Sequence, residues 1–108
     1  MQHRQASFPF SDLHSFKDYV GFVKLCAPDS FPHREGVSAS DQWSLGLAFE
    51  GLKLGLELAA QGGAKASALA ECQGLFSTAY EQYVAGNLKE GFGAMAAAQR
   101  VLRKLPSR

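Results

Sequence analysis

Apolar residues recur every three or four positions in four stretches of the chain. That spacing places them on one face of an α-helix, because 3.6 residues complete one turn. We therefore predict helices over about 12–26, 41–61, 64–85 and 88–105. The inward face of the first helix would consist of Leu13, Phe16, Tyr19, Val20, Val23 and Cys26.

Residues that begin or end helices stand at the borders of these stretches. Ser11 and Ser40 are suited to be N-caps, because a serine oxygen accepts a hydrogen bond from a free backbone N–H. Pro28 and Pro106 would end the first and last helices, and Gly86 would end the third. Short turns join the last three helices, which predicts that they pack as antiparallel neighbours.

The stretch 41–61 allows two interpretations. Large and small residues alternate along it, which would suit a β-hairpin turning at Glu50-Gly51. Wound as a helix, the same residues form two large apolar stripes, one of Trp43, Leu47, Leu54 and Leu58 and one of Leu45, Phe49, Leu52 and Leu56. The charged residues then share one narrow strip, which random alternation would not produce. We favour the helix.

A strip of small residues separates the two stripes, and it consists of Ser44, Ala48, Gly51, Gly55 and Ala59. Another helix can approach such a strip closely. Each internal glycine costs about 1 kcal/mol of helix propensity relative to alanine, so close packing must offset that cost. Because this helix is apolar around most of its circumference, we expect it to be the central helix of a bundle.

The composition agrees with an all-α fold. The chain has no Ile, a single Thr at position 78, five Val, 16 Ala and 13 Leu. Branched side chains favour strands, whereas Ala and Leu favour helices. We predict an all-α bundle of about four helices in a single domain spanning 1–108.

Two segments lie outside the predicted helices. Residues 1–10 resemble an extended arm whose Phe8-Pro9-Phe10 rings could fold back onto the core. Residues 27–41 form one long connection that contains Pro28, Pro32 and Gly36. Connections of this length are uncommon in compact domains and often carry function.

Charge and hydropathy point to no membrane and no nucleic acid. The net charge is +1, and no apolar run approaches the roughly 18 residues that a membrane span requires. No apolar stretch suited to a signal peptide follows the first residues, so we expect a cytoplasmic protein. Cys26 and Cys72 would then be reduced thiols, although two cysteines also allow a single disulfide.

Metal and nucleophilic chemistry have little support. His3, His14 and His33 stand far apart, and neither a CxxC nor an HxxxH pattern occurs. Cys26 and Cys72 both fall on apolar helix faces, where a structural role is the better interpretation. We expect no catalytic residues, no metal and no cofactor.

One polar segment and one basic cluster remain as candidates. Phe31, His33, Arg34 and Trp43 could form a pocket for a small acidic ligand, or the segment could be a solvated loop pinned by Phe31. Arg100, Arg103 and Lys104 form a basic surface cluster that complements the dipole at a helix C-terminus. It is too short to indicate nucleic-acid binding.

These observations favour a small non-enzymatic interaction module that binds a protein partner or itself. The chain is rich in large apolar residues, with eight Phe, and four helices need not cover all of them. An uncovered stripe would be an interface, so we predict a homodimer or a complex with a protein partner. The alternative is a small-molecule or anion pocket, binding or catalytic, near the 31–43 loop.

Overall fold

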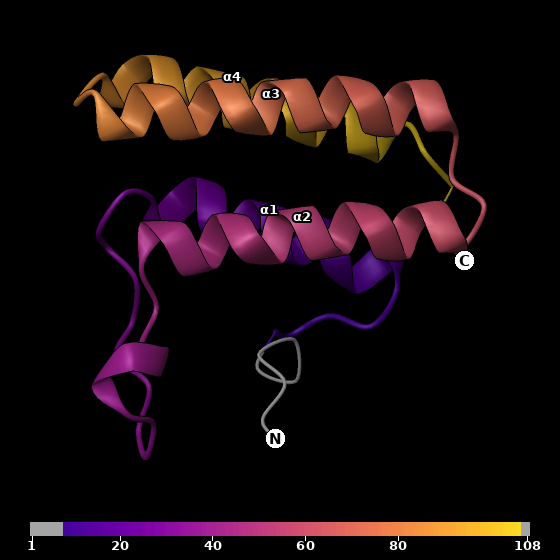
Figure 1. Cartoon of the computed structure of the whole chain (residues 1–108). Coiled ribbons are helices and arrows are strands. Elements are labelled where there is room, and N and C mark those ends of the chain that lie inside the picture. The colour runs from indigo at the N-terminus through magenta and orange to yellow at the C-terminus, as the bar shows by residue number, and fades with distance from the viewer. Residues whose placement is uncertain (1–7, 107–108) are drawn as a thin grey trace.

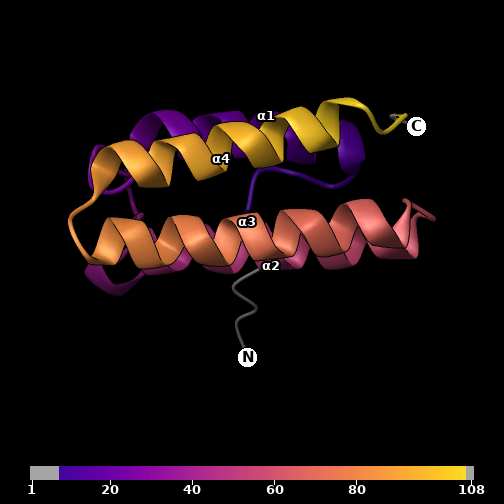
Figure 2. The same cartoon turned by 90° about the horizontal axis from the view of Figure 1, so that it is seen from above.

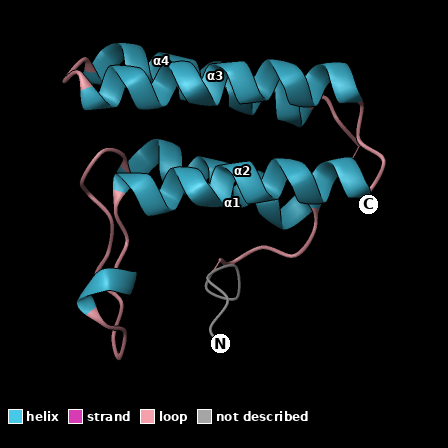
Figure 3. Ribbon diagram, viewed as in Figure 1, coloured by secondary structure: helices cyan, strands magenta, loops and turns pink. Residues whose placement is uncertain are grey.

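The computed structural model describes residues 8–106 and consists of four α-helices (Figure 1). They are α1 Leu13–Cys26, α2 Leu45–Gln61, α3 Ala66–Val84 and α4 Leu88–Arg103, with a short 3-10 helix, η2, at Ala39–Asp41. No strand occurs within 8–106 (Figure 3). The prediction of an all-α fold is confirmed, and the hairpin alternative for the second stretch is excluded.

The helices pack as two layers, with α1 and α2 in one and α3 and α4 in the other (Figures 1 and 2). Each helix contacts two neighbours, and the closest packing joins α3 to α4. Lys17 Nζ donates to the carbonyl of Leu105 and Lys24 Nζ to Gln99 Oε1, which shows that α1 and α4 run antiparallel. The sequence predicted that α2 would be the central helix. It instead occupies one corner of the bundle, beside α1 and α3.

Two helix starts differ from the prediction. Asp12 caps α1 instead of Ser11, because its carboxylate accepts from the backbone N–H of Ser15 at 2.9 Å while the Ser15 hydroxyl accepts from the backbone of Asp12. This reciprocal pair is a capping box with serine at its third position. Ser44 caps α2 instead of Ser40. The chain between 39 and 41 winds into η2, so α2 begins after Trp43.

The small-residue strip of α2 is the surface that meets α1. A Cβ atom on Gly55 would overlap the ring of Phe16, and one on Gly51 would overlap the hydroxyl of Tyr19. The predicted close approach is confirmed at these two positions. It does not apply to Gly46, which has nothing within 4 Å of its side-chain position.

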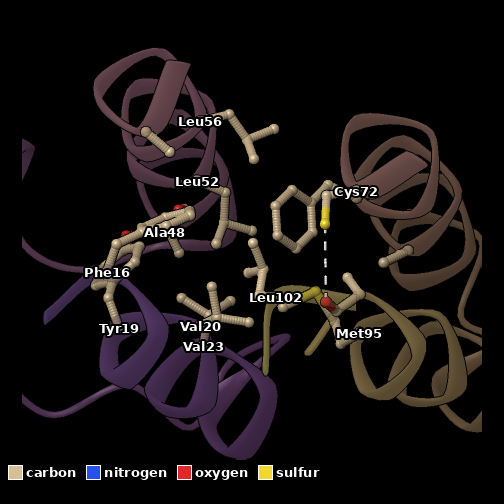
Figure 4. Packing of buried hydrophobic residues seen from close by; sticks show 14 of the residues in the cluster. Phe16, Tyr19, Val20, Val23, Ala48, Leu52, Leu56, Cys72, Met95 and Leu102 are labelled. Carbon is tan, nitrogen blue, oxygen red and sulfur yellow. Dashed lines mark hydrogen bonds between the residues drawn. The ribbon is translucent and has the colours of Figure 1, made fainter. Parts of the chain in front are cut away.

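Buried apolar side chains from all four helices meet between the two layers (Figure 4). Val20 of α1, Leu52 of α2, Cys72 of α3 and Met95 of α4 are all at most 1% exposed. Among residues 8–106, no polar or charged side chain is buried apart from those of Tyr19 and Tyr83. The core thus depends on apolar packing, and the helices owe most of their stability to it.

The predicted return of the N-terminal arm is confirmed for its two phenylalanines, whereas residues 1–7 of that arm lie outside the described part of the chain. Phe8 is 7% exposed, and its ring lies 6.1 Å from those of Tyr19 and Trp43. Phe10 contacts Phe16 at 5.3 Å. A continuous aromatic cluster therefore covers the α1 and α2 layer, and it consists of Phe8, Phe10, Phe16, Tyr19, Phe22, Phe31 and Trp43.

Candidate functional site

Three of the four residues predicted to form a pocket in the long connection do come together. The rings of Phe31 and Trp43 are stacked with centroids 6.1 Å apart. The guanidinium carbon of Arg34 lies 4.1 Å from the Trp43 ring, within the range of a cation–π contact. His33 is exposed. The structure thus brings the aromatic and guanidinium groups into one stack.

Gln42 holds this connection in shape. Its Oε1 accepts from the backbone N–H of Arg34 at 2.7 Å, and its Nε2 donates to the carbonyls of Arg34 and Val37, both at 2.9 Å. The side chain thereby bonds to both backbone groups of one residue, as a neighbouring strand would. The segment 34–42 is accordingly a hydrogen-bonded loop seated on the aromatic cluster.

A groove of about 1150 Å³ lies elsewhere, between α2 and α3. None of Phe31, His33, Arg34 and Trp43 lines it. Its walls come from both helices and from the segments that flank them: Ser40, Ser44, Gly46, Leu47, Phe49, Glu50, Leu52, Lys53, Leu56, Glu57, Ala60, Ala64, Ala66, Leu69, Ala70, Gln73, Phe76, Ser77, Tyr80 and Glu81.

The groove exists because the residues that flank its floor are small. Leu52 and Leu56 of α2 and Leu69 and Phe76 of α3 form a floor that is less than 10% exposed. Above it the walls carry many Ala, Gly and Ser side chains, at Gly46, Ala60, Ala64, Ala66, Ala70 and Ser77. Residues this small leave space above the floor unfilled, so the groove stays open to the surface.

Two aromatic rings meet near the end of the groove where α2 begins. Phe49 of α2 and Tyr80 of α3 meet edge to face with centroids 5.4 Å apart. Tyr80 is 40% exposed and therefore offers a large apolar surface with a polar tip, a combination enriched at protein interfaces. The groove consequently has an apolar floor, an aromatic end and small-residue walls.

The charges around the groove are mainly negative. Glu50, Glu57 and Glu81 line it, against a single cation, Lys53. Sequence reasoning identified part of the α2 side, since Phe49, Leu52 and Leu56 of the second apolar stripe line the groove, whereas Leu45 does not. It missed the opposite wall on α3, because the short turn predicts that the two helices are neighbours but not which face of α3 meets α2.

A second apolar surface lies at the end of the bundle where α3 turns into α4. Val84 is 64% exposed, Leu88 51% and Phe92 46%. Leu25, near the end of α1, is 75% exposed, and Lys24 Nζ lies 5.5 Å from the Phe92 ring. None of these residues lines the groove between α2 and α3 or takes part in its walls.

The basic cluster lies at the C-terminal end of α4, where Arg100, Arg103 and Lys104 are all exposed. Arg103 also lines a cavity of about 240 Å³ with His14, Lys17 and Asp18 of α1. The predicted complement to the helix dipole is present, since Arg100 and Arg103 stand in the last turn.

The two cysteines differ in their surroundings, and neither forms a disulfide. Cys72 is fully buried, its Sγ lies 3.7 Å from the Ala98 carbonyl (Figure 4), and burial raises the pKa of its thiol to about 11. Burial also raises the pKa of the partly exposed Cys26. High pKa values disfavour the reactive thiolate, so the geometry supports a structural role for both.

Within the described residues, no group of three or more His, Cys, Asp or Glu side chains is placed to hold a metal ion. No helix in the same part of the chain is long and apolar enough to cross a membrane. Comparison of the chain with protein-family models, curated proteins and solved structures finds no significant match.

Proposed function

We propose that this protein is a non-enzymatic interaction module that holds an amphipathic helix of a partner protein in the groove between α2 and α3. The observation that carries the proposal is the groove itself, about 1150 Å³ lined from both helices. Helix-in-groove recognition places apolar anchors, spaced three and four residues apart, into an apolar trough. The floor of Leu52, Leu56, Leu69 and Phe76 is such a trough.

The volume and length of the groove favour a large ligand over a small one. A drug-sized molecule is commonly held in about 300–1,000 Å³ with most of its surface covered. This groove exceeds that volume and follows two helices along their length, from Ser44 to Ala60 on one side and from Ala66 to Glu81 on the other. A partner helix would supply leucine or phenylalanine side chains where the walls have alanine.

Filling the groove tests the proposal. The variant Ala70→Trp/Ser77→Trp places two indole rings at exposed positions that line the groove. It should lose binding to a fluorescent, leucine-rich amphipathic peptide about as long as α3. The matched control, Ser67→Trp/Thr78→Trp, carries the same substitutions on exposed residues of α3 outside the groove. Equal peptide binding by both variants, measured by fluorescence anisotropy, would overturn the proposal.

Self-association remains part of the prediction, because the partner helix can belong to a second copy. Sedimentation equilibrium at micromolar and higher concentrations distinguishes the two cases. A dimer that the Ala70→Trp/Ser77→Trp variant abolishes would make the groove a homodimer interface. A monomer at all concentrations would leave a different protein as the occupant and contradict the predicted homodimer. The cytoplasmic location likewise stays a prediction.

A pocket for a small acidic ligand at Phe31, His33, Arg34 and Trp43 is the second candidate. It is favoured by Arg34, whose backbone is held by hydrogen bonds from Gln42 and whose guanidinium lies over the Trp43 ring. A thermal-shift screen of carboxylate and phosphate metabolites should then give a stabilising ligand that the His33→Ala/Arg34→Ala variant no longer binds. A ligand that still stabilises the variant would show that these residues do not form its binding site.

A further inference from the structure

We infer that the helix received by the groove is basic, with two cationic side chains about two turns apart. This inference rests on the proposed function and specifies the chemistry of the partner. Two carboxylates on the rim, Glu57 of α2 and Glu81 of α3, provide the complementary charge. Both side chains are exposed beside the groove, where a partner helix can reach them.

The contact between Phe49 and Tyr80 sets the spacing of these carboxylates. Because the two rings meet across the groove, Glu81, the neighbour of Tyr80, lies close to the level of Phe49. Glu57 follows Phe49 by eight residues, and a helix rises about 1.5 Å per residue, so the two acids are separated by about 12 Å along the groove. A partner helix matches that distance with cations seven or eight residues apart.

Lys53 lies between the two acids and adds a requirement for the sequence of the partner helix. It lines the groove one turn before Glu57, and a partner cation facing it would be repelled. The order of rim charges from the aromatic end is therefore negative at Glu50 and Glu81, positive at Lys53 and negative at Glu57. The partner consequently needs a neutral or acidic residue between its two cations, with apolar anchors on the adjacent face.

The acidic character of its rim also distinguishes the groove from the rest of the surface. The cations Arg100, Arg103 and Lys104 cluster on α4, which shares no close packing with α2. A groove with a mainly negative rim on a molecule of net charge +1 is a local feature. Local complementarity of this kind steers association and selects partners more than it adds affinity.

Two peptides with the same leucine face test the inference. One carries lysine at two positions seven residues apart beside the leucines, and the other carries glutamate there. The wild-type protein should bind the lysine peptide about tenfold more tightly at low salt, and the difference should shrink as salt screens the charges. The variant Glu57→Lys/Glu81→Lys should reverse the preference.

A charge-matched control isolates the rim from the overall charge. Glu35→Lys/Glu71→Lys changes the net charge equally at exposed residues outside the groove and should keep the wild-type preference. Equal affinity of both peptides for the wild type, or the same preference in both variants, would overturn the basic partner while leaving the groove as a docking site. Failure of both peptides to bind would overturn the docking proposal and this inference with it.

Discussion

The ring of Phe16 occupies the space where a Cβ atom on Gly55 would stand. This relationship explains why a helix-breaking residue is accommodated in the middle of α2. The glycine lets the backbone of α2 approach the aromatic side chains of α1, and Phe16, which is fully buried, fills the interface. The propensity lost in α2 is thus recovered as packing between α1 and α2.

The variant Gly55→Ala should therefore be destabilising although alanine is the better helix former. Overpacking a tight core costs roughly 1–3 kcal/mol, which exceeds the gain in propensity of about 1 kcal/mol. Because the added Cβ would overlap the Phe16 ring, we expect the overpacking cost to lie near the top of its range. The free energy of unfolding, measured with urea, should then fall by up to about 2 kcal/mol when both terms are combined. 

The matched control is Gly74→Ala in α3, where the added methyl group meets no atom within 4 Å. This substitution should raise the free energy of unfolding by about 0.5–1 kcal/mol, because glycine is the more costly residue in a helix interior. If both variants shifted stability in the same direction, the close approach of α1 and α2 would be wrong.

Two buried tyrosines should respond in opposite ways to removal of their hydroxyl groups. The Tyr19 hydroxyl donates to the Ala48 carbonyl at 2.8 Å, whereas the buried Tyr83 hydroxyl has no hydrogen-bond partner among the described residues. Tyr19→Phe should lose about 1 kcal/mol of stability and Tyr83→Phe should gain a similar amount, since an unsatisfied buried hydroxyl is costly. Chemical unfolding of the two variants measures the difference directly.

Alkaline pH should weaken the fold through the same side chains. Burial raises the pKa of Tyr19 and of Tyr83 above the ordinary value of 10.0. The unfolded chain therefore releases these protons first, so their contribution to stability is fully present below pH 10.0 and is lost as pH rises beyond it. A Tyr19→Phe variant should show a smaller decline in the free energy of unfolding above that pH, and an unchanged decline would contradict the burial of Tyr19.

Thiol labelling should separate the two cysteines. In the Cys26→Ala variant, a disulfide reagent at pH 8 should leave Cys72 unmodified until the protein unfolds, because its thiol is buried and has a pKa of about 11. In the Cys72→Ala variant, the partly exposed Cys26 should react faster, at a rate limited by its raised pKa. Rapid modification of native Cys72 would rule out its packing against Met95 and Ala98.

The single tryptophan reports on the loop. Arg34→Met keeps the aliphatic stem but removes the charge over the Trp43 ring. This change should lower the free energy of unfolding by about 0.5–1 kcal/mol and change the Trp43 emission. The control is Arg100→Met, at an exposed site on α4, which should leave both the free energy of unfolding and the emission unchanged. Identical emission spectra from the two variants would show that the guanidinium does not contact the ring in solution.

The helices were predictable because their signals are local. Spacing of three and four residues, the shortage of branched side chains and the glycine and proline stops all act within a few residues. The first residues of α1 and α2 were less predictable, since Ser11, Asp12, Ser40 and Ser44 are all chemically acceptable N-caps. Only the winding of residues 39–41 into η2 decided that α2 begins after Trp43.

The amino-acid sequence by itself determined that this chain is all-α, that α2 carries two apolar stripes and a small-residue strip, and that Phe31, Arg34 and Trp43 are near one another along the chain. Tertiary structure decided which surface of α2 meets which helix. The strip faces α1, whereas Phe49, Leu52 and Leu56 face α3 across an open groove. The physical reason is that burial of a helix face depends on the helix that packs against it, and the contact of Phe49 with Tyr80 exists only after folding.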